Sequence, residues 1–357
     1  MKEKLSALET YRGFAAIMIA AVHFNVNWSL FNNQIVNGYY VQLFFTLSGF
    51  VIYLNYKDKI TNFILLKKFI FRRFLRLYPL HFLFLIVFLI IEILKYIIEI
   101  KYNIAANNSA FSKNNLISFF YNLLMLQVFL DANTFNTPSW SISSEFFTYV
   151  IFAAIIIFKK NYYTTFYLII ALVLFYRINH NVEFGISHSY FAFLDCIYSF
   201  MIGVVFCKLS IKYSKNKILI HFNDLICLLF IILSITALFV LKNLYLFLLP
   251  VIFGFLLFFS KELTNKSLLG KVICNKIFIY LGKISYSIYM CHLFVFWVIT
   301  QFCRFVLNIK TYQDGDLHSR LELSTFQANI IILASYVLTI VLAHFTYGYV
   351  EKKFYKN

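Results

Sequence analysis

Long apolar stretches, separated by short polar ones, run along most of the chain. Their length is close to the roughly 20 residues that an α-helix needs to cross the hydrocarbon core of a membrane. The ten-residue alternation typical of membrane β-barrel strands is absent from the sequence. A shorter stretch, 116–130, is interpreted as an interfacial or re-entrant helix. The pattern predicts an all-α, polytopic integral membrane protein with about ten transmembrane helices, at residues 13–32, 38–56, 78–100, 141–158, 162–177, 189–208, 218–240, 243–260, 277–302 and 326–350.

The composition excludes most other classes of protein. Hydrophobic residues make up 61% of the 357 residues and charged residues only 13%, whereas a soluble domain carries about 25% charged residues. A water-soluble enzyme and a disordered chain are both excluded, because neither has so many apolar side chains. The six cysteines lie in or beside apolar stretches without a CxxC pair, so we expect buried thiols and no metal. No polar stretch is long enough for a separate domain, and residues 1–357 are expected to form a single transmembrane domain.

The charge pattern predicts an orientation. The 32 Lys and Arg residues outnumber the 15 Asp and Glu residues, and they gather between the apolar stretches. With Lys2 and Lys4 in the cytoplasm, 24 of the 32 basic residues fall on the cytoplasmic side. This bias predicts that both termini are cytoplasmic. Because the basic residues serve orientation, we expect no nucleic-acid partner.

Arg12 and His23 form the first candidate site. They are eleven residues apart, about 16 Å along a helix, and eleven steps of about 100° place them on one face. Arg12 is expected at the cytoplasmic edge and His23 near the middle of the membrane, so the face joins an anion-binding end to a proton-handling centre. Two structural alternatives stay open: Arg12 extending toward the lipid headgroups, and His23 bonding to a neighbouring helix.

A basic segment at about 58–77 is the second candidate. Its cationic side chains lie on one broad face of an amphipathic helix on the cytoplasmic surface. Pro79 is expected to open the following span. The guanidinium groups suit a polyphosphate such as coenzyme A, although attraction to lipid headgroups explains the same pattern. The arginines concerned are Arg72, Arg73 and Arg76.

Two further segments carry hydroxyl groups at helical spacing. In residues 137–149, Ser141 and Glu145 belong to a polar stripe at the outer end of the fourth span, where Trp140 could stack on a sugar. In residues 281–297, Tyr286, Tyr289 and His292 recur at three-residue spacing. A capped helix end explains the first stripe equally well, and hydrogen bonding between helices explains the second set.

Taken together and in order, the motifs resemble membrane-bound acyltransferase family 3. The segment LETYRGFAAIMIAAVHF is similar to the family's opening, through Glu9, Arg12, Gly13 and His23, with Glu9 where the family commonly has Asp. QLFFTLSGFVI, which contains Ser48, resembles its second-span signature. RRFLRLYP resembles its basic segment, and SWSISSEFFTY and ISYSIYMCHL resemble its later motifs.

The resemblance implies a bacterial inner-membrane O-acyltransferase. Such enzymes move an acyl group, usually acetyl from acetyl-CoA as co-substrate, to a hydroxyl of a cell-surface carbohydrate such as O-antigen, capsule, exopolysaccharide or peptidoglycan. The expected partners are acyl-CoA, a carbohydrate or lipid-linked glycan acceptor, and membrane lipids.

The residue roles follow as a hypothesis. His23 is the general base or carries the acyl group, with Arg12 and Glu145 assisting it. Arg72, Arg73 and Arg76 bind the CoA phosphates. Acceptor contacts are assigned to Trp140, Ser141, Tyr286, His292 and Ser48, although close helix packing is the favoured explanation of Ser48. A glycolipid transporter or flippase, and a sensor or scaffold, remain alternatives.

Overall fold

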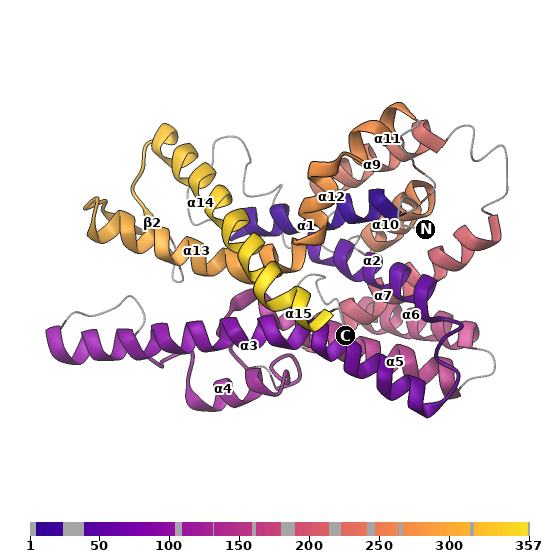
Figure 1. The fold of residues 1–357 in the computed structure, drawn as a ribbon, viewed down its shortest axis with the longest axis horizontal. Coiled ribbons are helices and arrows are strands. Elements are labelled where there is room, and N and C mark those ends of the chain that lie inside the picture. Colours follow the sequence, from indigo (N-terminus) through magenta and orange to yellow (C-terminus); the bar gives the residue numbers. More distant parts are fainter. Residues whose placement is uncertain are drawn as a thin grey trace.

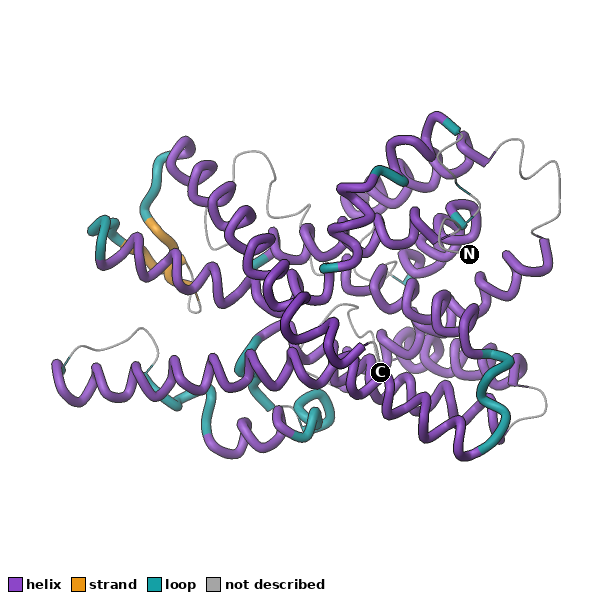
Figure 2. Tube along the Cα trace, in the orientation of Figure 1, coloured by secondary structure: helices purple, strands orange, loops and turns teal. Residues whose placement is uncertain are grey.

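The computed structural model describes residues 5–23, 39–103, 109–130, 132–158, 162–179, 190–213, 223–240, 247–261, 263, 267–314 and 318–355. Residues 24–32 of the first predicted span lie outside this set, as do Lys2, Lys4, Lys159 and Lys160. The described residues are predominantly helical, with a short antiparallel hairpin of β1 (Thr311–Asp314) and β2 (His318–Leu321) (Figure 2).

Each of the ten predicted spans is helical over nearly all of its described part. The helices are α1 (Ser6–Val22), α2 (Tyr40–Tyr56), α3 (Phe63–Tyr102), α4 (Leu116–Leu123), α5 (Trp140–Phe158), α6 (Tyr162–Asn179), α7 (Tyr190–Tyr213), α9 (Asn223–Val240), α10 (Leu248–Ser260), α11 (Leu268–Ile273), α12 (Lys276–Lys283), α13 (Ser285–Phe305), α14 (Thr325–Thr346) and α15 (Lys352–Tyr355). A single turn, Thr137–Ser139, precedes α5, and a π-helical turn, Tyr347–Glu351, joins α14 to α15. The all-α class is confirmed; ten membrane crossings and cytoplasmic termini stay predictions.

Four helical segments among the described residues are long and apolar enough to cross a membrane. Shorter apolar helices lie within α6, α9 and α10. This set is that of a multi-pass membrane protein. The long segments are Thr137–Phe158, Phe191–Tyr213, Ser285–Phe305 and Thr325–Phe354.

The predicted helix start at Pro79 is wrong. Pro79 lies inside α3, which begins at Phe63 and continues for 40 residues along one side of the molecule (Figure 1). Asn62 caps its start, where the side chain accepts a hydrogen bond from the backbone N–H of Leu65. From Phe63 onward, the basic segment and the third predicted span are thus one helix, which carries Arg73 and Arg76 toward the interior of the bundle.

The predicted span 277–302 is also corrected, because it contains a break. The backbone leaves the helical conformation at Ile284, which separates α12 from α13. Immediately before the break, Gly282 packs on α1: a Cβ atom added there would lie 1.9 Å from the carbonyl oxygen of Glu9. The reciprocal position on α1 is Gly13, where a Cβ would lie 2.7 Å from the backbone nitrogen of Gly282. Two glycines therefore allow the backbones of α1 and α12 to touch.

A second close crossing fixes α2 against α7. A Cβ on Gly49 would lie 1.9 Å from the carbonyl oxygen of Phe200, and a Cβ on Gly203 would lie 1.9 Å from that of Thr46. Small residues allow helices in a membrane to pack by direct backbone contact. The crossing sets the position of Ser48, the residue before Gly49.

Candidate active site

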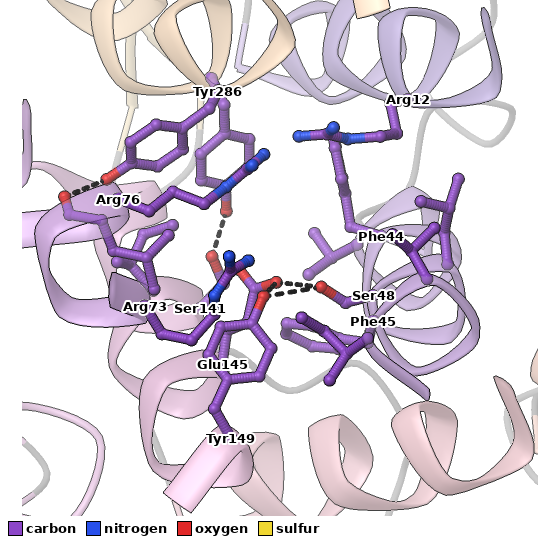
Figure 3. Close-up of a pocket in the computed structure, with 17 residues that line it drawn as sticks. Arg12, Phe44, Phe45, Ser48, Arg73, Arg76, Ser141, Glu145, Tyr149 and Tyr286 are labelled. Carbon is purple, nitrogen blue, oxygen red and sulfur yellow. Dashed lines mark hydrogen bonds between the residues drawn. The ribbon is translucent and has the colours of Figure 1, made fainter. Parts of the chain in front are cut away.

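A polar pocket lies between α1, α2, α3, α5 and α13 (Figure 3). Its volume is about 80 Å³, smaller than the roughly 300–1,000 Å³ of a pocket that encloses a whole small molecule. Four charged side chains line it: Arg12 from α1, Arg73 and Arg76 from α3, and Glu145 from α5. Ionisable groups inside a membrane bundle are costly and mark functional sites.

Glu145 is held by two hydroxyl groups. Ser48 on α2 and Tyr149, one turn along α5, both donate hydrogen bonds to Oε1 of Glu145. The Ser48 and Tyr149 hydroxyls are also 2.8 Å apart. Ser48 therefore does more than allow close packing, because it fixes a carboxylate on the pocket wall.

Arg73 is the strongest sign of an anionic ligand. Its side chain is buried, with 8% exposure, and Nη2 donates to the Tyr56 hydroxyl at 3.1 Å. Its guanidinium also lies over the rings of Tyr56 and Phe69, 5.2 and 5.9 Å from their centroids. Among the described residues, Nε has no hydrogen-bond partner. A buried N–H without a partner is unfavourable, so Arg73 fits a site where a ligand oxygen completes the set.

The other two arginines extend into the pocket from opposite sides (Figure 3). Nη1 of Arg12 lies 3.3 Å from Oε2 of Glu9, one turn earlier on α1. Arg76 and Arg12 both interact electrostatically with Glu351, a buried carboxylate in the π-helical turn after α14. Ser287 donates to Oε2 of Glu351 at 2.9 Å. The C-terminal segment thus places a carboxylate within electrostatic range of two pocket arginines.

Hydroxyl groups from α5 and α13 complete the wall. Ser141 lies 2.7 Å from the Tyr289 hydroxyl, which donates to the carbonyl of Pro138. The Tyr286 hydroxyl donates to the carbonyl of Leu77 at 2.6 Å. The sequence pattern places Arg12 and Ser141 at opposite membrane ends, yet both line this pocket.

His23 and His292 form a separate pair beside the pocket. Nε2 of His292 is 3.2 Å from Nδ1 of His23, which is also 3.0 Å from the carbonyl oxygen of Ile19. His292 is fully buried, and its ring lies 6.1 Å from that of Tyr289, which lines the pocket. The pocket lining includes Arg12 but not His23. Arg12 thus lines the pocket directly, whereas His23 reaches its wall only through His292 and Tyr289.

Besides His23 and His292, two more predicted residues lie outside the pocket lining. Arg72 is exposed and is not among the lining residues, although its neighbour Arg73 is buried there. Trp140 packs edge-on against Phe45 behind the wall, with ring centroids 6.2 Å apart. Sequence reasoning assigned no role to Tyr149 or Glu351. Glu351 could have been noticed as an acidic residue at the end of the last apolar stretch, next to Lys352.

The fold and this pocket define a multi-pass membrane protein with an arginine-lined polar site between its helices. The family model described as "Acyltransferase domain" matches residues 5–348, nearly the whole chain, so the protein belongs to this acyltransferase family. The predicted family resemblance is confirmed.

One similar curated protein is "Acyltransferase MdmB" from Streptomyces mycarofaciens, which is 32% identical over 164 residues. The match covers 42% of this chain and 38% of that relative. No solved structure matches the chain.

Proposed function

We propose that the protein is an O-acyltransferase of the bacterial cytoplasmic membrane. It transfers an acyl group, acetyl in the simplest case, from acyl-CoA to a hydroxyl of a cell-surface carbohydrate. The family match and the acyltransferase name of the relative support acyl transfer. The observation that carries the proposal is the pocket that gathers Arg12, Arg73, Arg76 and Glu145.

The residues present fit a CoA thioester as acyl donor. Guanidinium groups bind phosphate oxygens through charge-assisted hydrogen bonds, and Arg73 offers a buried Nε without a protein partner among the described residues. A volume of about 80 Å³ admits only part of such a molecule. In this proposal Arg73 and Arg76 bind the donor, Arg12 assists from α1, and the exposed Arg72 has no contact role.

The geometry of the histidine pair favours His23 as the general base. Nδ1 of His292 lies 3.3 Å from the carbonyl oxygen of Ile288, which only an N–H can satisfy. Nε2 of His292 is then unprotonated and accepts a hydrogen bond from Nδ1–H of His23. The same N–H of His23 also faces the carbonyl oxygen of Ile19. This assignment, inferred from the hydrogen bonds, leaves the lone pair on Nε2 of His23.

The transfer balances with His23 as base. Nε2 of His23 takes the proton of the acceptor hydroxyl while its oxygen bonds to the acyl carbon. The C–S bond breaks, and the proton passes from His23 to the leaving thiolate. Tyr289 and His292 connect this imidazole to the pocket. A direct transfer of this kind needs no acyl group on the protein.

The pocket hydroxyls suit a carbohydrate acceptor. Glu145 is fixed by Ser48 and Tyr149, and its carboxylate can accept a hydrogen bond from a sugar hydroxyl. Ser141 and Tyr286 add oxygen atoms nearby. The predicted cytoplasmic placement of the basic loops agrees with a donor made in the cytoplasm.

Deletion of the gene tests the proposal. NMR spectra of purified surface glycan from the deletion strain should lack O-acetyl signals that the parent shows, and the plasmid-borne gene should restore them. The purified protein should release CoA from acetyl-CoA only when glycan acceptor is present. Unchanged glycan acylation in the deletion strain would contradict the carbohydrate assignment.

A further inference from the structure

A second cavity lies on the other side of α1 and α2 from the polar pocket. Its volume is about 300 Å³, and residues of α1, α2, α9, α10, α11 and α12 line it. Phe14, Leu43 and Ile235 are typical of the wall. The cavity is roughly twice the volume of the dry apolar cavity of about 150 Å³ that binds benzene in another protein.

The cavity offers a ligand almost no hydrogen bonds. Of the four hydroxyl-bearing residues of the wall, all but Tyr40 have a hydrogen-bond partner in the part of the chain that the structure describes. Thr10 donates to the carbonyl of Ile273, and Ser234 donates to the carbonyl of Phe230. The Tyr11 hydroxyl is 2.8 Å from that of Ser260. Water needs several polar partners in such a space, so a hydrocarbon chain suits it better.

The wall of the cavity continues into an apolar outer surface. Phe14, Ile235, Val272 and Phe278 line the cavity and are also exposed, between 44% and 61%. In a multi-pass membrane protein this surface faces lipid chains. The cavity can therefore be reached from the bilayer.

Three lysines lie on α11 and α12, the helices of the cavity wall that are nearest the predicted cytoplasmic side. Lys271 is on α11, and Lys276 and Lys283 are at the two ends of α12. All three are exposed and form no ion pair with described residues. Val272, Ile273, Phe278 and Leu281 of the same two helices line the cavity. Positive charge and an apolar chamber thus occur on the same short helices.

We propose that this cavity binds an acyl chain of an anionic phospholipid of the cytoplasmic leaflet. The chain lies between α1, α9 and α10, and the headgroup phosphate contacts the lysines of α11 and α12. A lipid there would brace α1 and α2 from the side opposite to Arg12 and Ser48. The site is separate from the proposed acyl-transfer site and does not depend on that activity.

The test uses the full-length protein in mixed detergent micelles with equal amounts of dioleoylphosphatidylglycerol and dioleoylphosphatidylcholine. Native mass spectrometry should show the anionic lipid retained at least about tenfold better, because each lysine near the headgroup adds attraction. The triple variant Lys271→Ser, Lys276→Ser, Lys283→Ser should lose the preference. A matched control, Lys101→Ser, Lys113→Ser, Lys310→Ser, removes the same charge from exposed positions elsewhere and should keep it.

A second pair of variants tests the chamber itself. Ser234→Phe places a ring in the cavity and should reduce retention of both lipids, whereas Ser234→Ala should not. Equal retention of the two lipids by the parent would overturn the proposal. The proposal would also be overturned if the two triple variants showed the same lipid preference, or if folded Ser234→Phe retained both lipids as well as the parent does. Displacement of the phospholipid by a trace of polyprenyl phosphate would overturn it too.

Discussion

Two cavities of opposite character share α1 and α2 as a common wall. One face of these helices gives Arg12 and Ser48 to a polar pocket of about 80 Å³. The other face gives Phe14 and Leu43 to an apolar cavity of about 300 Å³. In a soluble protein, the larger apolar cavity would be the first candidate for the active site.

The comparison shows that volume is a poor guide to function inside a membrane. Lipid chains are always available to fill apolar space, so an apolar cavity needs no special function to persist. Buried charges are different, because each is unfavourable unless the site uses it or pairs it. The smaller cavity, with three arginines and a glutamate, is therefore the one we propose as the site of chemistry.

The largest effect is expected on stability, at Gly49, where the packing of α2 on α7 holds the wall between the two cavities in place. Gly49→Leu should strongly destabilise the fold, because the first added atom would lie 1.9 Å from the backbone oxygen of Phe200 on α7. Overpacking of this severity costs about 3 kcal/mol or more. Gly348→Leu is the control, since nothing lies within 4 Å of an added Cβ there. Thermal unfolding in detergent compares the two, and equal stability would mean that this crossing does not set the wall.

A large loss of activity is expected next, at the histidine pair. His23→Ala should lower kcat by roughly 10²–10⁴-fold, the usual contribution of a general base. His344→Ala removes an exposed histidine on α14 and should leave the rate within about twofold of the parent. CoA release at matched amounts of folded protein measures both. A His23→Ala enzyme with the parent's rate would remove this residue from the reaction.

A smaller effect is expected for the buried arginine. Arg73→Ala should raise the KM for acetyl-CoA by roughly 10–100-fold, because a hydrogen bond to a charged group contributes about 1.5–3 kcal/mol. Its exposed neighbour gives the matched control: Arg72→Ala should change KM by less than about twofold. If the two variants behave alike, the basic segment acts through its charge alone and the polar pocket does not select the donor.

The smallest effect is expected at Glu351, which acts through other residues. Glu351→Gln removes the charge that interacts with Arg76 and Arg12 but keeps a group that Ser287 can reach. We expect the KM for acetyl-CoA to rise about three- to tenfold with kcat unchanged, which is the pattern of a positioning residue. Glu322→Gln, at an exposed position, is the control. A fall in kcat alone would place Glu351 in the chemical step instead.

The sequence predicted most of the pocket but not its arrangement. Arg12, Ser48, Arg73, Arg76, Ser141, Glu145 and Tyr286 were all candidates, and all line one cavity. The separation of Arg72 from Arg73 could not be predicted, because helical spacing defines a broad polar face without showing which edge meets α2 and α5. Pro79 gave a wrong helix start for a similar reason: local preference favours a start there, and packing along α3 overrides it.

The apolar stretches alone determined the helical class and the approximate helix positions, because a segment that faces lipid must satisfy its backbone hydrogen bonds internally. The order of the motifs determined the family. Only the tertiary structure decided which polar groups meet. Contacts such as Ser48 with Glu145, or His23 with His292, join residues far apart in the chain. Glycine crossings that no spacing rule reveals hold α1 against α12 and α2 against α7, and so position the helices that carry His23 and Ser48.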